Sequence, residues 1–256
     1  RLVDAAAREM GIDPAELRHR NMIAPDQFPH RTVTGHTYDS GDYARTLDAG
    51  LAGADRAGFE ARREAAAARG RLRGFGMAYY VERCGVGGSE TARIRFDGTG
   101  ALTLLVGTQS NGQGHETAYA QIAAALLSVP IEAIRVVQGD TDAIGYGRGT
   151  GGSRSLQICG PAIQIAAAKV VAKAKRIAGH MLEAAEADIT FTDSRFTVRG
   201  TDRAVALGAV VARAFDPASL PPEIEPGLDE QAHYAQEGYT FPNGCHVAGG
   251  EIDPET

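Results

Sequence analysis

The chain has 256 residues, of which 43% are hydrophobic and 23% are charged, and its formal net charge is −6. These values are typical of a globular protein with a sizeable core, and the acidic balance argues against a nucleic-acid-binding surface. No apolar run approaches the roughly 20 residues that a membrane helix needs, and no signal segment opens the chain. The three cysteines, Cys84, Cys159 and Cys245, are odd in number and far apart. This spacing favours a reducing, cytoplasmic compartment over a disulfide framework or a zinc site.

The first 24 residues are predicted to form two short helices. Leu2, Val3, Ala6 and Met10 follow helical spacing, and Gly11 is a suitable C-terminal cap. The pair Asp13-Pro14 supplies an N-cap and a first-turn proline for the second helix. The chain begins on a helix and ends, over residues 246–256, on a strand leading into a turn. We therefore expect an internal piece of a longer protein.

Residues 25–69 are predicted to be a connection followed by one helix, and residues 71–107 to be strands. The stretch 25–40 is polar and rich in proline, and Ser40 or Asp42 is a candidate cap for a helix over 42–69. Residues 71–83 have the pattern of a strand. Two apolar, β-branched runs within 90–107 flank Asp97–Gly100, which predicts a hairpin.

The second half alternates between helices and strands. A helix after His115 is followed by a strand over 131–140, which predicts a β-α-β order. A long helix is expected over 156–187, a hairpin over 189–200, a short helix over 206–215 and a polar loop over 216–240. Strands that come as hairpins between helices favour an α+β fold over a doubly wound parallel sheet.

Two glycine-rich loops are the most informative feature of the sequence, because each leads directly into a helix. The first covers Gly107–His115 and the second Gly145–Ser155. A helix N-terminus has unpaired N–H groups and a positive dipole end, and glycines let the backbone approach an anion closely. Two such ends predict a ligand with several phosphate or carbonyl oxygens. We therefore expect Gln113 to lie near the loop Thr150–Ser155.

Other motifs give weaker indications. The loop at 150–155 lacks the Gly-Lys-Ser/Thr ending of a P-loop, which disfavours phosphoryl transfer. His115-Glu116 lacks the second histidine of a zincin motif, so no metal ligand is assigned. Glu82 and Glu90 flank a glycine-rich segment and are interpreted as solvated loop carboxylates. The cysteines are interpreted as structural residues.

Several segments, in order along the chain, resemble one family. They are 112–117, 134–141 and 146–155, with further matches at 5–23, 38–43, 74–82, 246–248 and 251–256. Together they resemble the large subunit of the molybdenum hydroxylases, the xanthine dehydrogenase and aldehyde oxidase family that includes aerobic carbon-monoxide dehydrogenase.

The resemblance implies an α+β molybdopterin-binding fold truncated at both ends. It implies that residues 1–24 end a first molybdenum-cofactor-binding domain, 25–69 form a connection and helix, and 70–256 form a second, incomplete domain. The implied cofactor is molybdenum with molybdopterin cytosine dinucleotide in the parent protein. FAD and [2Fe-2S] clusters are implied on partner subunits or domains of an oligomeric complex.

The same resemblance implies the roles of individual residues. Gln113 corresponds to the glutamine that hydrogen-bonds an oxo ligand of molybdenum, and Gly112, Gly114 and His115 accompany it around the pterin. The residues implied at the pyrophosphate are Thr150, Gly151, Gly152, Ser153, Arg154 and Ser155. Hydroxyl, amide and guanidinium groups suit such oxygens.

Departures from the family pattern limit this interpretation. The family's substrate-facing loop would precede residue 1, and its glutamate base would follow residue 256. Gly249-Gly250 replaces a charged-apolar pair, so an irregular strand is expected there. The chain alone is expected to be inactive on the family's aldehyde, heteroaromatic or CO substrates. A non-catalytic cofactor- or anion-binding module remains the alternative, with an ordinary phosphate-ligand transferase as a weaker one.

Overall fold

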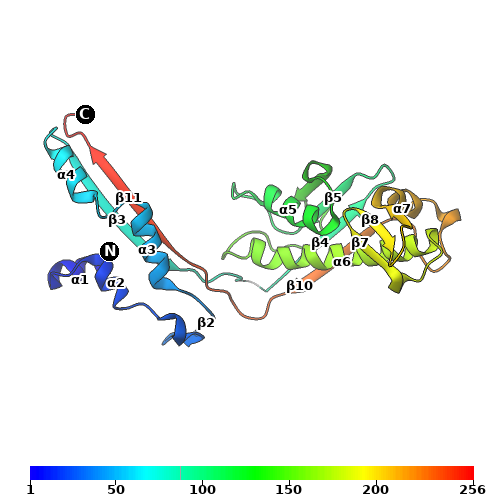
Figure 1. The fold of residues 1–256 in the computed structure, drawn as a ribbon, viewed down its shortest axis with the longest axis horizontal. Helices are drawn as coiled ribbons and strands as arrows, with labels where there is room; N and C mark the ends of the chain where they lie inside the picture. Colours follow the sequence, from blue (N-terminus) through cyan, green and yellow to red (C-terminus); the bar gives the residue numbers. More distant parts are fainter. Residues whose placement is uncertain (87) are drawn as a thin grey trace. The chain divides into compact units, whose positions relative to one another are not determined.

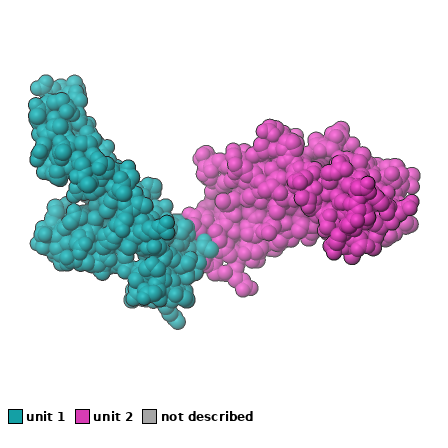
Figure 2. All heavy atoms as spheres, in the orientation of Figure 1, with its two compact units in different colours: residues 1–83, 240–256 teal, residues 84–239 magenta. Residues whose placement is uncertain are grey.

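The structure is a computed structural model that describes residues 1–86 and 88–256. The chain divides into two compact units, coloured separately in Figure 2. The first contains residues 1–83 and 240–256, and the second contains residues 84–239. Among the described residues, each unit has its own helices and two sheets, both two-stranded in the first unit and four- and three-stranded in the second (Figure 1). The assignment of residues 70–256 to a second cofactor-binding domain stays a prediction.

The first unit consists of short helices and a two-stranded ribbon. Its elements are α1 (Leu2–Met10), α2 (Pro14–His19), β1 (His30–Arg31), β2 (Thr37–Tyr38), α3 (Tyr43–Gly53), α4 (Phe59–Ala67), β3 (Leu72–Val81) and β11 (Asn243–Ile252). The predicted caps of the first two helices are confirmed. Gly11 adopts a left-handed conformation with φ 66°, and the Asp13 carboxylate accepts from the Ala15 amide at 2.7 Å.

The prediction of one continuous helix over 42–69 is wrong, because the chain forms α3 and α4 there. Asp42 caps α3 as expected, accepting from the amide of Arg45 at 3.1 Å. The break lies at Asp55, which has φ 47° and whose carboxylate accepts from the Gly58 amide. A left-handed residue interrupts the series of helical hydrogen bonds. The glycines nearby have low helix preference, so they favour a break in this region.

The ribbon pairs β3 with β11 in antiparallel register from Val81 opposite Asn243 to Leu72 opposite Ile252. Gly249 and Gly250 pair without interruption, so the expectation of an irregular strand is wrong. Figure 1 shows α3 and α4 lying along this ribbon. Packing of helices on one face compensates for the low strand preference of glycine.

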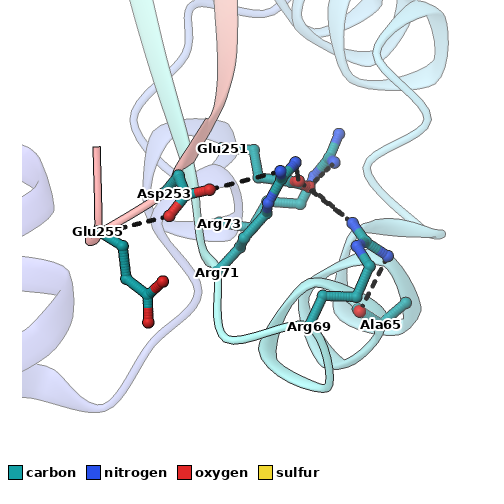
Figure 3. Close-up of polar contacts among 7 residues, drawn as sticks. All are labelled: Ala65, Arg69, Arg71, Arg73, Glu251, Asp253 and Glu255. Atoms are coloured by element: carbon teal, nitrogen blue, oxygen red, sulfur yellow. Dashed lines mark hydrogen bonds and ion pairs between the residues drawn. The ribbon is translucent and has the colours of Figure 1, made fainter.

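Three arginines surround one carboxylate at an end of the ribbon (Figure 3). Glu251 accepts from Arg69 at 3.2 Å and from Arg71 and Arg73 at 3.1 Å each. Hydrogen bonds from Arg71 and then Arg69 hold the pKa of Glu251 below its ordinary value. The cluster joins β11 to the start of β3 and to the residues that follow α4.

The second unit is built on a four-stranded sheet with two helices against it. Its elements are β4 (Ser89–Phe96), β5 (Leu102–Val106), α5 (His115–Leu127), β6 (Ile134–Gln138), α6 (Ser155–Met181), β7 (Ile189–Thr192), β8 (Arg195–Val198), β9 (Ala204–Ala206), α7 (Leu207–Ala214) and β10 (Asp229–Ala235). The sheet order is β10-β4-β5-β6, and β5 and β6 are parallel. The predicted β-α-β order and the α+β class are therefore confirmed.

Strand β10 lies where the sequence predicted a polar loop over 216–240, and that prediction is wrong. Its seven residues pair with β4, and only Ala232 among them is buried. A strand at a sheet edge buries little of its surface and can carry polar residues on both faces. The alternation of apolar and polar residues that predicts a strand is then absent.

Helix α6 is the main core element of this unit. It packs against α5, β4 and β10, and the most buried core side chains include Ile94, Leu104, Tyr119, Ile163 and Val170. Its length and composition would also suit a membrane span, but half of its apolar window is buried inside the structure. In this structure α6 therefore serves as a core helix of the second unit. It ends at Met181, six residues before the end predicted from sequence.

Candidate cofactor site

The first glycine loop ends at the N-terminus of α5. Gly112 and Gly114 have φ of 99° and 78°, conformations that favour glycine. The side-chain Oε1 of Gln113 accepts from the backbone amide of Asn111, so its amide lies against its own turn. Amide orientation is assigned from hydrogen bonding, and this orientation leaves two N–H donors on Nε2. No side chain among the described residues caps α5.

The second glycine loop ends at the N-terminus of α6. Gly149, Gly152 and Ser153 all have positive φ, at 71°, 57° and 50°. The hydroxyl of Thr150 hydrogen-bonds that of Ser155 at 2.8 Å across the loop. As for α5, the described part of the chain offers no side-chain cap to the 27-residue helix α6. Its first N–H groups are therefore available to a ligand.

The two loops lie against each other, as the sequence predicts. The Gly149 amide donates to the Gly107 carbonyl at 3.2 Å, and the Thr150 hydroxyl donates to the Gln109 carbonyl at 2.5 Å. At Gly147, an added Cβ would lie 2.3 Å from the Gly107 carbonyl oxygen. Glycine is therefore required where the loops cross.

Both loops line one cavity of about 930 Å³. Seven predicted site residues line it: Gln113, His115, Thr150, Gly151, Ser153, Arg154 and Ser155. Gly112, Gly114 and Gly152 belong to the same turns without lining it. Prediction missed six further lining residues: Cys84, Asn111, Ala118, Leu156, Gln157 and Pro161. Leu156, Gln157 and Pro161 lie on the first turns of α6, directly after the second loop. Helical spacing from the loop could have predicted that they face the same cavity.

The lining contains no aspartate or glutamate among the described residues, and it includes the arginine Arg154. The N-terminal residues of α5 and α6 both belong to it. Two positive dipole ends and a lining without carboxylates favour an anionic ligand. A cavity of this size suits a large ligand.

Arg154 is buried, with an exposed fraction of 4%, and forms an ion pair with the fully buried Glu90. The interpretation of Glu90 as a solvated loop carboxylate is therefore wrong. Glu90 lies on β4 opposite Tyr234 of β10, at the start of the hairpin predicted over 90–107, and the sequence gave no sign that Arg154 would pair with it. No described residue accepts a hydrogen bond from Nε of Arg154.

His115 occupies the first position of α5 and is 5% exposed. Its ring lies 5.0 Å from that of Tyr119, and its Nδ1 lies 3.4 Å from Oε1 of Gln138. Within residues 1–86 and 88–256, no three side chains of His, Cys, Asp or Glu are grouped as a metal site. His115 therefore shapes the cavity wall without a metal cluster around it.

The fold and the site together define an α+β domain with a cavity at two helix N-termini, and comparison with known proteins assigns its family. The sequence profile described as "Molybdopterin cofactor-binding domain" matches residues 52–256. The chain therefore belongs to this molybdopterin cofactor-binding family, as its resemblance implied.

Three known proteins illustrate the similarity. The carbon monoxide dehydrogenase large chain of Hydrogenophaga pseudoflava is 38% identical over all of this chain and 34% of its own length. The crystal structure of a Cu,Mo-CO dehydrogenase in its carbon monoxide reduced state is 34% identical with a TM-score of 0.83, covering 98% of this chain and 34% of that one. Quinoline 2-oxidoreductase from Pseudomonas putida 86 is 35% identical with the same TM-score and coverage. The chain thus spans about a third of the length of these relatives.

Proposed function

We propose that this chain is part of the catalytic subunit of a molybdenum hydroxylase and binds molybdopterin cytosine dinucleotide. The observation that carries this proposal is the cavity between two uncapped helix N-termini, which both glycine loops line. A dinucleotide cofactor has a pyrophosphate and many further acceptor oxygens. Helix N-termini and glycine loops are a recurring way to hold such groups.

The residues present fit this cofactor. Backbone N–H groups at the start of α6 are suitable donors to phosphate oxygens, and Ser153 adds a hydroxyl to the lining. The hydroxyl protons of Thr150 and Ser155 are used in the bonds to the Gln109 carbonyl and between the two side chains. The buried Nε–H of Arg154 lacks an acceptor in the described part of the chain. An unmatched buried donor is costly, and a ligand oxygen would satisfy it. Gly151 leaves room for close approach, since nothing lies within 4 Å of an added Cβ.

Gln113 lines the same cavity and would hydrogen-bond an oxo ligand of molybdenum. Its Nε2 amide retains two N–H donors while Oε1 is held by Asn111. When bound, the cofactor supplies two-electron oxidation with transfer of water-derived oxygen to the substrate. This chain holds and orients that group. Iron–sulfur and FAD partners would carry the electrons away, and the substrate would be an aldehyde, a heteroaromatic compound or CO.

A chimeric large subunit tests this function. This chain would replace the matching third of the Hydrogenophaga pseudoflava large chain, and molybdenum and cytidine nucleotide would be measured per subunit beside CO oxidation. We expect a chimera that contains both components. A correctly assembled chimera without either component would contradict the proposal. Isothermal titration of the 256-residue chain with inorganic pyrophosphate measures the anion site separately, and hydroxylase turnover by this chain alone would show that the catalytic residues are misplaced.

Cofactor content without turnover in the chimera would favour the alternative of a non-catalytic binding module. The unchanged Hydrogenophaga subunit is the control for assembly and metal loading. Because the chimera keeps two thirds of a carbon monoxide dehydrogenase large chain, CO is the substrate to assay first.

A further inference from the structure

The segment Arg148–Arg154, part of which lines the cavity, is held by a residue outside both glycine loops. Glu90 lies on β4, and its side chain has no exposed surface. Its Oε1 accepts from the backbone amide of Arg148 at 2.8 Å and from NH1 of Arg154. One carboxylate oxygen therefore contacts both ends of this segment.

Arg154 extends the same connection to the backbone on either side. Its NH1 also donates to the Gly149 carbonyl at 2.8 Å, and its NH2 donates to the Ser89 carbonyl at 2.7 Å. The ion pair thus joins the start of the segment, its end and the beginning of β4. A planar guanidinium that donates to a carboxylate and two backbone carbonyls restricts geometry more than a single neutral hydrogen bond does.

Hydrogen bonds also hold the middle of the segment: the Gly149 amide and the Thr150 hydroxyl contact the first glycine loop, and the Gly152 and Ser153 carbonyls accept from the amides of residues 86 and 85. Residues 148–154 include no apolar side chain, so the segment cannot be anchored by hydrophobic packing. Three of its residues have positive φ, and its glycines have many alternative conformations in the free chain. A buried ion pair contributes little net stability compared with an apolar pair, but it can fix one conformation of the groups that it joins.

We propose that Glu90 is a positioning residue, which holds Arg154 and the segment 148–154 in the conformation that receives the pyrophosphate of the cofactor. The proposal deepens the proposed function and rests on it for the identity of the ligand. Glu90 is absent from the residues that line the cavity, so it acts through Arg154 and the Arg148 amide. The unmatched Nε–H of Arg154 then becomes a fixed donor instead of a mobile one.

Hydrogen exchange of the 256-residue chain, measured by mass spectrometry, tests the positioning without any cofactor. Glu90→Gln keeps the side-chain size and one acceptor oxygen but removes the charge. We expect amides in peptides covering 148–154 to exchange at least tenfold faster, with no change in the β7–β8 hairpin. Unchanged exchange in 148–154 would overturn the proposal, as would an equal increase throughout the second unit.

Asp229→Asn is the matched control. Asp229 also pairs with an arginine of β4, at 2.5 Å from Nε of Arg93, but this pair is partly exposed and contacts neither glycine loop. Loss of that pair should leave exchange in 148–154 at the wild-type rate. An increase equal to that of Glu90→Gln would show a general loss of sheet stability and would overturn the proposal.

A double-mutant cycle shows whether Glu90 acts through Arg154. The increase in exchange for Glu90→Gln with Arg154→Gln should match the larger single effect, because both changes break the same connection. Additive effects would contradict this. If Glu90→Gln does not fold, Glu90→Asp carries the test, because it keeps the charge and shortens the reach. In Glu90→Asp, the exchange rate of amides in 148–154 should increase less than in Glu90→Gln. An exchange rate in 148–154 equal to that of wild type would overturn the positioning role.

Inorganic pyrophosphate separates this inference from the proposed function. We expect Glu90→Gln to weaken pyrophosphate binding about tenfold relative to wild type and Asp229→Asn. Failure of the wild-type chain to bind pyrophosphate would count against the proposed function, while the exchange data would still decide the positioning role. Equal affinity of wild type and Glu90→Gln would contradict positioning of the anion site.

Discussion

Glu90 and Arg154 form a buried ion pair in which one atom on each side has no hydrogen-bond partner among the described residues. These atoms are Oε2 of Glu90 and Nε of Arg154. The pair lies directly behind the loop that leads into α6, and Arg154 itself lines the cavity. Arg154 therefore has a structural role in addition to any contact with phosphate.

Arg154→Ala is expected to destabilise the second unit as well as lower cofactor content. Removing the guanidinium leaves Glu90 buried without a counter-charge, a change that costs about 3–5 kcal/mol. Urea unfolding of the chain measures this loss. Asp229→Asn, which breaks a partly exposed pair, should cost about 1 kcal/mol or less. Equal losses of unfolding free energy in the two variants would show that the buried Glu90–Arg154 pair matters no more for stability than the partly exposed pair.

Gln113→Ala is expected to affect turnover more than cofactor content in the chimeric subunit. Gln113 is exposed, and its side-chain contact is to the amide of Asn111 in its own turn, so the fold should tolerate its loss. A lost hydrogen bond at the reacting centre should raise the barrier by about 1–3 kcal/mol. Molybdenum content and CO oxidation rate, measured on one preparation, check this. Normal turnover with full metal content would remove Gln113 from the active site.

Gly147→Ala is expected to displace the second glycine loop. The new Cβ would lie 2.3 Å from the Gly107 carbonyl oxygen, and overpacking of this kind typically costs about 1–3 kcal/mol. Gly145→Ala is the matched control, since nothing lies within 4 Å of a Cβ there, and should change stability by no more than about 0.5 kcal/mol. Thermal unfolding compares the two variants, and equal melting temperatures would contradict the crossing geometry.

Glu251→Gln is expected to destabilise the first unit at neutral pH and much less in acid. The folded-state pKa of Glu251 is lowered, chiefly by its hydrogen bond from Arg71. Its contribution is therefore present above the unfolded-state pKa and is lost as pH falls through the folded-state pKa. Melting temperatures at about pH 7 and about pH 3 should show a difference between wild type and variant that shrinks in acid. Glu255→Gln is the control, because no interaction joins its carboxylate to the arginines in Figure 3. A difference independent of pH would contradict this account.

Cys159 is expected to resist alkylation until the second unit unfolds. Its side chain has no exposed surface, and burial raises the pKa of its thiol to about 12. The reactive thiolate is then scarce and inaccessible at neutral pH. Mass spectrometry after iodoacetamide treatment, with and without urea, measures this directly. Cys84 and Cys245 are partly exposed and act as internal references. Rapid native modification of Cys159 would show that α6 opens readily.

Prediction from sequence succeeded where the determining residues are close along the chain. Gly11 and Asp13 give local signals for the end of one helix and the start of the next, and both are confirmed. The glycine loops were also identified locally, because each precedes a helix. The break at Asp55 was missed, since a left-handed residue other than glycine has only a weak sequence preference.

Prediction failed where long-range pairing decides the structure. Strand β10 forms because β4 offers it a partner far away in sequence, whereas its own residues favour a loop. Gly249 and Gly250 remain in a regular strand because β3 pairs with them throughout. The burial of Glu90 also depends on a partner 64 residues away.

The sequence by itself determined the family, the α+β class and the two glycine loops that lie at helix starts, since these follow from local patterns. Only the tertiary structure decided how the loops meet at Gly107 and Gly147, and which group neutralises Arg154. Both depend on backbone and side-chain contacts between segments that are distant along the chain. Local preference has no information about such contacts, because the free energy that fixes them arises only when the segments are buried together.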